Sequence, residues 1–484
     1  MKELIFILLG FVCLDSVGQI SEVNYFSFGN ESEEYSTDID TLGSFLYLVG
    51  NTNECGSNDG FVVRYKDDSI YKRVILGSDH IEVIEAIETY SADTLFIAGY
   101  TNLNQDYDVY LSKLDTNLNI LKTKTIELNS WNFCKDIVMG HGFLIGAGET
   151  HNGVDYDAFL FKTNTNLDTL WTYFLPQLEN QKLTKVIRYN DSIYIACGYS
   201  EVPGKDKEVL LISINTNTGD TLWTNTYGGL NEDYCNSLIR AQDGGLVGFG
   251  TTSSFTSPNK DTYLFKVDSA GSFLWSNLHQ VQSPSNTLNE DGIDLIELNN
   301  GDLIVSAITE SLGGYEVKST MIMKTTPSGN WLGGYIYDGG HDDFPTAMVK
   351  VNDTTIYVGG ISNSQSFGYS DPSILKLKHV NVNNTINIIQ KEQANLCYVG
   401  LKEKEDNNKL NVYPNPVKSE FTISSSKNER IEVIIYDLLG QEVFRKKEMT
   451  NSSIPLPTVL PFGSYVISVN NNEEVSFLKI IYAK

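Results

Sequence analysis

A short apolar run that usually ends in glycine recurs about every 50 residues along most of this chain, and this repeat restricts the possible folds more than any other feature. A period of this length is typical of proteins built from repeated supersecondary units. The sixth copy ends in alanine instead of glycine. The seven copies are Leu46–Gly50, Leu95–Gly99, Leu144–Gly148, Ile193–Gly198, Leu246–Gly250, Leu303–Ala307 and Ile356–Gly360.

A second apolar element follows each copy by about ten residues and usually opens with an acidic residue, as in Asp59–Arg64 and Asp108–Lys113. A turn rich in Asn, Asp and Gly comes next, and four copies then place a tryptophan, namely Trp171, Trp223, Trp275 and Trp331. Each unit therefore holds about four short strands. A lone four-stranded sheet cannot bury both faces, whereas seven sheets arranged radially can. We predict an all-β fold whose first part, residues 19–380, is a seven-bladed β-propeller. An open β-solenoid is the rival, but its repeats are usually shorter.

The ring of blades also needs a closing strand, because an open ring leaves exposed strand edges. Residues 23–29 resemble residues 223–229, which form the fourth strand and following turn of a complete repeat. They stand before the first full repeat, and the last repeat ends after three strands near Lys378. We predict that residues 22–28 form the outer strand of the last blade. Residues 384–390 are the alternative source of that strand.

The first 18 residues have the pattern of a secretory signal peptide. Lys2 precedes an apolar run from Leu4 to Leu14, and small residues lead to a cleavage site between Gly18 and Gln19. The run is too short to span a bilayer, and no other segment reaches that length, so we expect no transmembrane segment after cleavage. Cys13 raises lipid attachment as an alternative, although Val12 is larger than the residue usually found before a lipid-modified cysteine.

The net charge restricts the classes of partner to be expected, and the cysteines restrict the kinds of site. A formal net charge of −26 without a Lys/Arg cluster disfavours nucleic acid as a partner. Five cysteines remain after cleavage, an odd number, and none forms a Cys-x-x-Cys pair. Cys134, Cys197 and Cys235 lie in apolar strand-like runs, so we interpret them as small buried hydrophobic residues.

The last part of the chain has a different pattern. Residues 381–408 are polar and charged and are predicted to be a linker, and residues 409–484 contain short alternating strands that predict a small immunoglobulin-like β-sandwich. Pro414 and Pro416 fix an extended start, and Gly440 suits a hairpin turn. The motif residues, in order, are Tyr413, Pro414, Asn415, Pro416, Asp437, Gly440, Gly463, Tyr465 and Lys479.

Two resemblances follow from these motifs. The segment from Lys266 to Trp275, with Tyr227-Gly228-Gly229 and Asp243-Gly244-Gly245, resembles a propeller family abundant in secreted proteins of the Bacteroidota. The four-part tail motif resembles the type A sorting domain of the type IX secretion system. This second resemblance implies passage through the periplasm, handling by the type IX machinery, and a final location outside the cell or on its outer surface.

No catalytic constellation is recognisable in the sequence, so we expect no catalytic residues, no metal and no cofactor. The chain lacks His-Glu-x-x-His, Gly-x-Ser-x-Gly and phosphate-binding loops. Acidic pairs such as Asp106/Asp108 and Asp155/Asp157 could hold Ca²⁺, but strand-start turns explain them as well.

Two further motifs have both a functional and a structural interpretation. Residues 213–223 resemble the tryptophan-docking motif of quinone-dependent propeller dehydrogenases, in one unit only, with Asn215 where those families carry Asp. Asp-Ser/Thr followed by an apolar residue, as at Asp191, is similar to the O-glycosylation acceptor of these bacteria and is also good turn chemistry.

These observations favour a non-enzymatic, exported propeller that binds a glycan or a protein through its loops. The alternative is an extracellular polymer-degrading hydrolase or lyase that uses loop carboxylates which no motif identifies.

Overall fold

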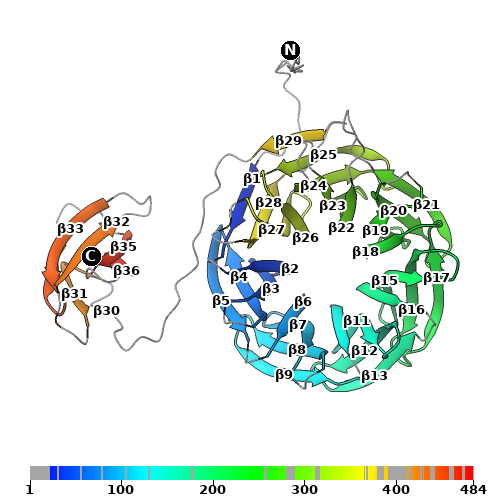
Figure 1. Ribbon diagram of the computed structural model, residues 1–484, viewed down its shortest axis with the longest axis horizontal. Coiled ribbons are helices and arrows are strands. Elements are labelled where there is room, and N and C mark those ends of the chain that lie inside the picture. Colours follow the sequence, from blue (N-terminus) through cyan, green and yellow to red (C-terminus); the bar gives the residue numbers. More distant parts are fainter. Residues whose placement is uncertain are drawn as a thin grey trace, which may run out of the picture. The chain divides into compact units, whose positions relative to one another are not determined.

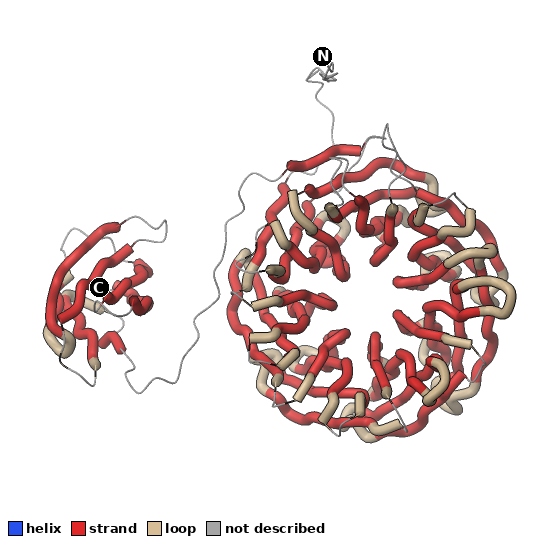
Figure 2. The backbone as a smooth tube through the Cα atoms, in the orientation of Figure 1, coloured by secondary structure: helices blue, strands red, loops and turns tan. Residues whose placement is uncertain are grey.

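A computed structural model shows a ring of β-sheets and a second, smaller group of strands (Figures 1 and 2). The structure describes residues 22–378, 386–390 and 411–482, with gaps inside these ranges. The gaps are residues 30–31, 55–56, 78–79, 104–105, 129–130, 176–178, 256–258, 280–288, 311–316, 339, 365, 367–368, 414–416, 426–427, 429, 437–441, 457–462 and 471–474. All regular elements among the described residues are strands, which confirms the all-β prediction.

Seven four-stranded antiparallel blades form the ring, as the repeat predicted. Of the four strands named for each blade, the first is innermost and the fourth is outermost. The first four blades are β2 Glu34–Leu42, β3 Phe45–Thr52, β4 Asp59–Lys66 and β5 Ser69–Leu76; β6 Glu82–Tyr90, β7 Thr94–Thr101, β8 Asp108–Asp115 and β9 Ile120–Ile126; β10 Asn132–Met139, β11 Phe143–His151, β12 Tyr156–Asn164 and β13 Thr169–Leu175; β14 Gln181–Arg188, β15 Ile193–Glu201, β16 Lys207–Asn215 and β17 Thr221–Tyr227. The last three are β18 Asp233–Arg240, β19 Leu246–Thr252, β20 Asp261–Val267 and β21 Phe273–His279; β22 Glu290–Glu297, β23 Leu303–Glu310, β24 Lys318–Thr325 and β25 Trp331–Asp338; β26 Asp343–Asn352, β27 Thr355–Ser362, β28 Asp371–Lys378 and β1 Glu22–Ser27.

The N-terminal strand β1 closes the ring, which confirms the predicted origin of the outer strand of blade 7. It pairs antiparallel with β28 in a register that runs from Glu22 opposite Lys378 to Ser27 opposite Ser373. The alternative segment forms strand β29, Ile386–Gln390, which instead pairs in parallel with β25 on the outer edge of blade 6. Blade 6 is therefore a five-stranded sheet, and part of the segment expected to be a linker lies against it.

The recurring glycine of the sequence repeat has a steric cause. Each innermost strand has a register shift, or β-bulge, near its middle, as between Ile84 and Ala86. A Cβ atom on Gly99 would lie 1.9 Å from the carbonyl oxygen of Val83 just before that bulge, and one on Gly148 would lie 2.0 Å from the carbonyl oxygen of Phe133. Blade 6 carries Ala307 at this position, and there the residue opposite on the inner strand is Gly292.

The tryptophans of blades 3, 4 and 5 pack against turn glycines of the following blade. A Cβ on Gly271 would lie 3.1 Å from the ring of Trp223, and Gly271 has φ +81°, which favours glycine. Trp171 faces Gly219 in the same way, and its indole nitrogen donates a hydrogen bond to the carbonyl of Thr216 at 3.1 Å. The tryptophan motif is thus a device for packing one blade on the next.

The hydrophobic cores lie between neighbouring blades. One cluster combines Phe96 and Leu111 of blade 2 with Cys134, Phe159 and Phe161 of blade 3, all fully buried. Cys134, Cys197 and Cys235 are buried free thiols, as predicted, while Cys55 and Cys397 lie outside the described residues. Each blade therefore depends on its neighbours for burial of both faces.

The C-terminal strands belong to a separate compact unit, Leu401–Lys484. The strands are β30 Asn411–Tyr413, β31 Glu420–Ser424, β32 Arg430–Tyr436, β33 Glu442–Met449, β34 Ser453–Pro455, β35 Gly463–Asn470 and β36 Val475–Tyr482. They form sheets of order β30-β31-β34 and β33-β32-β35-β36. One core contains Phe421 and Ile454 of the first sheet and Val433 and Ile467 of the second, so the unit is a β-sandwich as predicted.

Candidate functional site

The top face of the propeller is the face at which each innermost strand begins. It carries the turns from the second to the third strand of a blade and from the fourth strand to the next blade. A buried acid or amide stands at the start of every innermost strand: Glu34, Glu82, Asn132, Gln181, Asp233, Glu290 and Asp343. In six blades this group accepts a hydrogen bond from a Thr or Ser at the end of the second strand, as from Thr150 to Asn132 at 2.7 Å. These buried bonds hold the two strands that carry the top turns.

Exposed apolar side chains gather on the turns of this face. Among the described residues, the large hydrophobic side chains exposed on top turns are Leu103, Trp131, Val154, Leu230, Phe255 and Tyr369. Most of the other exposed ones in the described part of the chain lie on the outermost strands, and the bottom face has only Val351, at the end of β26. Turns are usually polar, so these apolar groups make the top face the candidate site to consider.

Six aromatic rings form a continuous cluster on the top face of blades 2 and 3. Its members are Tyr100, Tyr107, Trp131, Phe133, His151 and Tyr156. Trp131 is 42% exposed and is held between Tyr107, with ring centroids 5.8 Å apart, and His151, at 5.6 Å. Its carbonyl accepts a hydrogen bond from the His151 backbone at 2.8 Å. The indole is therefore exposed but fixed in position, so it can contact a ligand at little entropic cost.

Charged side chains around this cluster are paired across the seams between blades. Lys135 of blade 3 lies 2.6 Å from Glu85 of blade 2, and Lys182 of blade 4 lies 3.4 Å from Glu149 of blade 3. Further round, Glu232 lies 2.7 Å from the Lys207 ammonium, and the hydrogen bond from Lys207 lowers the pKa of Glu232. The charges on this part of the top face thus largely cancel one another.

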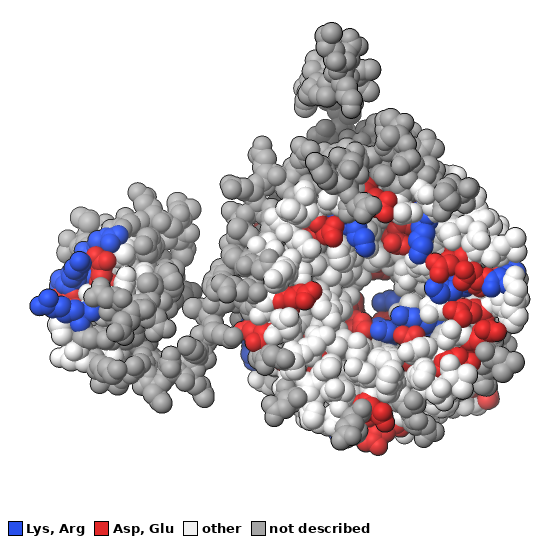
Figure 3. Space-filling view, viewed as in Figure 1, with Lys and Arg blue, Asp and Glu red and all other residues white. Residues whose placement is uncertain are grey.

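The central channel contains a second charged group, built from the innermost strands. On the face shown in Figure 3, acidic and basic side chains surround the mouth of the channel. Inside the ring, Lys185 lies 3.3 Å from Asp136, and Asp38 and Asp294 also act on it. Burial alone would lower the pKa of Lys185, but these three carboxylates raise it well above its usual value.

The channel carboxylates act as clamps between blades. Asp38 of blade 1 accepts a hydrogen bond from the Ile87 amide of blade 2 at 2.9 Å, and Asp136 of blade 3 accepts one from the Val186 amide of blade 4 at 2.7 Å. Asp294 of blade 6 accepts one from Met348 of blade 7 at 2.6 Å. These bonds occupy the exposed edge amides of the innermost strands, so they stabilise the ring.

Three of the four acidic residues considered for Ca²⁺ are engaged locally or buried, and Asp106 is exposed. The Asn152 amide donates hydrogen bonds to Asp155 and, at 2.9 Å, to Asp157, which agrees with the turn interpretation. Asp108 is buried at the start of β8. Within the described part of the chain, no group of three or more His, Cys, Asp or Glu side chains is arranged to hold a metal ion.

The residues predicted from the tail motif are only partly described. Tyr413 lies on β30 opposite Thr422, Gly463 begins β35 opposite Tyr482, and Lys479 of β36 lies opposite Val466. Tyr465 is buried in the core of the sandwich. Pro414, Asn415, Pro416, Asp437 and Gly440 lie outside the described residues, as do Gly18 and Gln19 of the predicted cleavage site. Their roles remain predictions.

Sequence reasoning missed the aromatic cluster and the channel carboxylates. The members of the cluster come from two repeats and from both turns and strands, so no local motif links Tyr107 to Trp131 or His151. A signal did exist for the channel: an aspartate recurs at the same place in three innermost strands, directly after the bulge, as Asp38, Asp136 and Asp294.

Residues 411–483 match a family model described as a secretion system C-terminal sorting domain. The protein is a β-propeller with a type IX secretion sorting domain. This domain directs export through the type IX system, so the sorted propeller reaches the cell surface or is released. No helix in the described part of the chain has both the length and the apolar character needed to cross a membrane.

Several solved structures resemble this chain at low sequence identity. PorZ, described as an essential bacterial surface component of the type-IX secretion system of Porphyromonas gingivalis, is 12% identical with a TM-score of 0.43, and the match covers 92% of this chain but 59% of PorZ. The propeller domain of the Trilobed protease from Pyrococcus furiosus is 10% identical with a TM-score of 0.41, covering 72% and 96% of the two chains. Quinohemoprotein alcohol dehydrogenase from Comamonas testosteroni is 9% identical with a TM-score of 0.46, covering 79% and 80%. No curated protein matches the sequence. The fold assignment therefore depends on this chain's own sheets.

Proposed function

We propose that the propeller is a non-enzymatic module that binds an extracellular glycan or protein through its top face. The observation that supports this proposal most directly is the concentration of exposed apolar side chains on the top turns, with Trp131, Phe255 and Tyr369 as the aromatic members. Exposed aromatic residues held in place by neighbours are the usual anchors of binding surfaces.

The charges on the top face favour binding over catalysis. A general acid for polymer cleavage needs a carboxyl group with a raised pKa and access to the substrate. Glu85, Glu149 and Glu232 are each engaged with a lysine instead, and the pKa of Glu232 is lowered. All three carboxylates are thus engaged in ion pairs, which suits specificity at a surface better than proton donation.

The chain offers matched controls for a test. Trp131 and Phe255 lie on top turns at 42% and 50% exposure, whereas Trp331 and Phe273 lie on outermost strands at 36% and 50%. We would screen the mature protein on arrays of polysaccharides and extracellular proteins and measure the dissociation constant of each ligand found. The pair W131A/F255A should weaken binding by about tenfold or more, since truncated aromatic anchors cost more than about 1.4 kcal/mol. The pair W331A/F273A should bind as the wild type does.

Two results would contradict the proposal. Equal loss of binding in both double variants would show that the top face is not the contact surface. Release of shortened chains from a bound polymer by the wild type would show an enzyme, in which case the top-face carboxylates become the residues to vary.

A further inference from the structure

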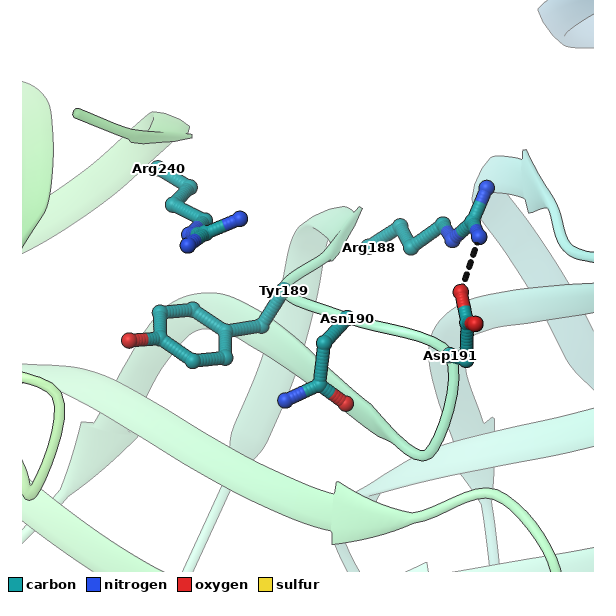
Figure 4. Close-up of a pocket in the computed structure, with 5 residues that line it drawn as sticks. All are labelled: Arg188, Tyr189, Asn190, Asp191 and Arg240. Carbon is teal, nitrogen blue, oxygen red and sulfur yellow. Dashed lines mark hydrogen bonds and ion pairs between the residues drawn. The ribbon is translucent and has the colours of Figure 1, made fainter. Parts of the chain in front are cut away.

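A hollow on the bottom face has a chemistry different from that of the top face. It has a volume of about 510 Å³ and is lined by Arg188, Tyr189, Asn190, Asp191 and Arg240, at the seam between blades 4 and 5. Figure 4 shows the guanidinium of Arg240 above the ring of Tyr189, while Arg188 points away towards Asp191. This volume lies within the usual range for small-ligand sites, so the hollow suits one or two small units rather than a folded domain.

Two acceptors in the wall, the Asn190 side-chain oxygen and Asp191 Oδ1, are already occupied. The Asn190 side-chain oxygen accepts from the backbone amides of Ser192 at 2.9 Å and Ile193 at 2.8 Å. Asp191 Oδ1 accepts from Arg188, and this hydrogen bond lowers the pKa of Asp191. These two oxygens are therefore engaged within the protein and leave the donors of the wall as the groups that can meet a ligand.

Donors remain available. The Tyr189 ring, 4.8 Å away, is the only contact of the Arg240 guanidinium among the described residues, and Arg240 is exposed. The side-chain oxygen of Asn190 is occupied, but its amide nitrogen is a second, neutral donor in the lining of the hollow. Because Arg188 and Asp191 cancel, the lining carries one uncompensated positive charge. A planar guanidinium fork with one free charge matches a carboxylate, which brings two acceptor oxygens and a single negative charge.

The net charge of the whole protein disfavours long, densely charged polyanions. At −26 the molecule repels polyanions at long range, whereas screening at physiological salt limits this repulsion to about 8 Å. A single carboxylate therefore responds mainly to Arg240, while a nucleic acid or a phosphate chain meets repulsion from the rest of the surface.

The residues that line the hollow also indicate which class of ligand bears the carboxylate. Among the described residues that line the hollow none is aliphatic, and the face of the one aromatic ring among them lies under Arg240. An acidic peptide would present apolar carbon to a wall with no apolar pocket, whereas a sugar presents hydroxyl oxygens to the Asn190 and Arg240 donors. We propose that this hollow binds a uronic acid unit, with Arg240 on the carboxylate and Asn190 on a ring hydroxyl. This site is independent of the top-face ligand.

The test uses the full-length mature protein and a trimer of galacturonic acid, titrated by calorimetry and by saturation-transfer NMR. The wild type should bind the trimer saturably, and R240Q should weaken binding by about tenfold, the loss expected for a charge-assisted hydrogen bond. The matched control is R64Q. Arg64 also lies over an aromatic ring, that of Phe45 at 3.7 Å, but on blade 1, and it donates a hydrogen bond to Asn117 at 3.0 Å as well. R64Q therefore removes the same charge and the same kind of ring contact at a different place.

Further measurements distinguish this site from the top face and an acidic sugar from other ligands. A galactose trimer, which lacks the carboxylate, should not bind, and W131A/F255A should bind the acidic trimer as the wild type does. The proposal is overturned if the folded wild type shows no saturable binding of the trimer, if R240Q and R64Q bind equally, or if the neutral trimer binds as well as the acidic one. Preferential binding of a Glu-rich peptide of equal charge would overturn it too. Thermal unfolding of each variant confirms that it is folded.

Discussion

Tyr25 of the N-terminal strand β1 lies opposite Leu375 of the last propeller repeat in an antiparallel pair. This pair joins the two ends of the propeller sequence within one blade, so the last blade cannot be completed without the first strand. The predicted cleavage after Gly18 would leave only a few residues before β1 begins at Glu22. Closure therefore depends on residues that lie close to the predicted cleavage site.

Deletion of residues 20–28 should destabilise the propeller strongly. It removes the whole of β1, exposes the edge of β28 and removes Phe28, which is 1% exposed in the closed ring. We expect a loss of about 3 kcal/mol or more in unfolding free energy, since burial of a single large apolar side chain contributes about 1.5–3 kcal/mol. The measurement is denaturant unfolding of the purified protein.

The matched control for that deletion is removal of residues 386–390. This segment, β29, is also an outer strand, but it is added in parallel to a blade that already has four strands. Its loss should change the unfolding midpoint far less. Equal destabilisation by the two deletions would show that ring closure is not what β1 provides.

The strand-ending glycines give a second prediction. G99A should destabilise the protein by about 1–3 kcal/mol, because its new Cβ would lie 1.9 Å from the Val83 carbonyl oxygen and the bulge would have to move. G359A is the control, because the nearest atom to its Cβ would be a Leu48 methyl at 3.4 Å, an ordinary contact. It should be close to neutral, or stabilising by about 0.5 kcal/mol through the lower entropy of the unfolded chain. Thermal melts of both variants would decide, and a G99A midpoint equal to that of the wild type would refute the steric explanation.

The repeat could be read from the sequence because its cause is local. Gly99 and Trp223 each take part in a contact that recurs in several blades. The same residue types therefore recur at the same places in several sequence repeats. The closing strand was predictable for the same reason, since residues 23–29 copy a fourth strand. The sites depend on differences between blades. Arg240 contacts Tyr189 of the previous blade, and Trp131 contacts His151 of its own blade, so each contact joins residues that are distant in the sequence and occurs in one place only.

The carboxyl groups of the innermost strands allow a prediction of how the unfolding free energy varies with pH. Burial, reinforced by neighbouring carboxylates, raises the pKa of Asp38 to about 7 and that of Glu88 to about 8. Both values exceed the unfolded values of about 4, so between about pH 4 and pH 8 the folded state retains protons that the unfolded chain has released. The contribution of Asp38 and Glu88 to the unfolding free energy is therefore most favourable at low pH and is lost as the pH rises from about 4 to about 8.

We expect the unfolding free energy to fall between about pH 5 and pH 8, by an amount of order 1 kcal/mol for each group, since both side chains are only half-buried. E88Q removes one titrating group and should flatten the decline and raise stability at about pH 8. E33Q, the same change on an exposed side chain, should leave the slope as in the wild type. A wild-type slope in E88Q would exclude Glu88 as a cause.

Export gives the last prediction, and it depends on the C-terminal unit. The sandwich has its own core around Val433 and Ile467 and so can fold apart from the propeller. Deletion of residues 409–484 should leave a folded propeller that crosses the inner membrane and accumulates in the periplasm. Immunoblots of periplasmic, surface and culture fractions measure this, and the thermal midpoint of the truncated propeller checks its fold. Fusion of residues 401–484 to a periplasmic fluorescent protein should carry that protein out of the cell. A truncated propeller that still arrives outside would show that export depends on residues before 409, and a fusion that stays in the periplasm would show that the sandwich needs part of the propeller to be recognised.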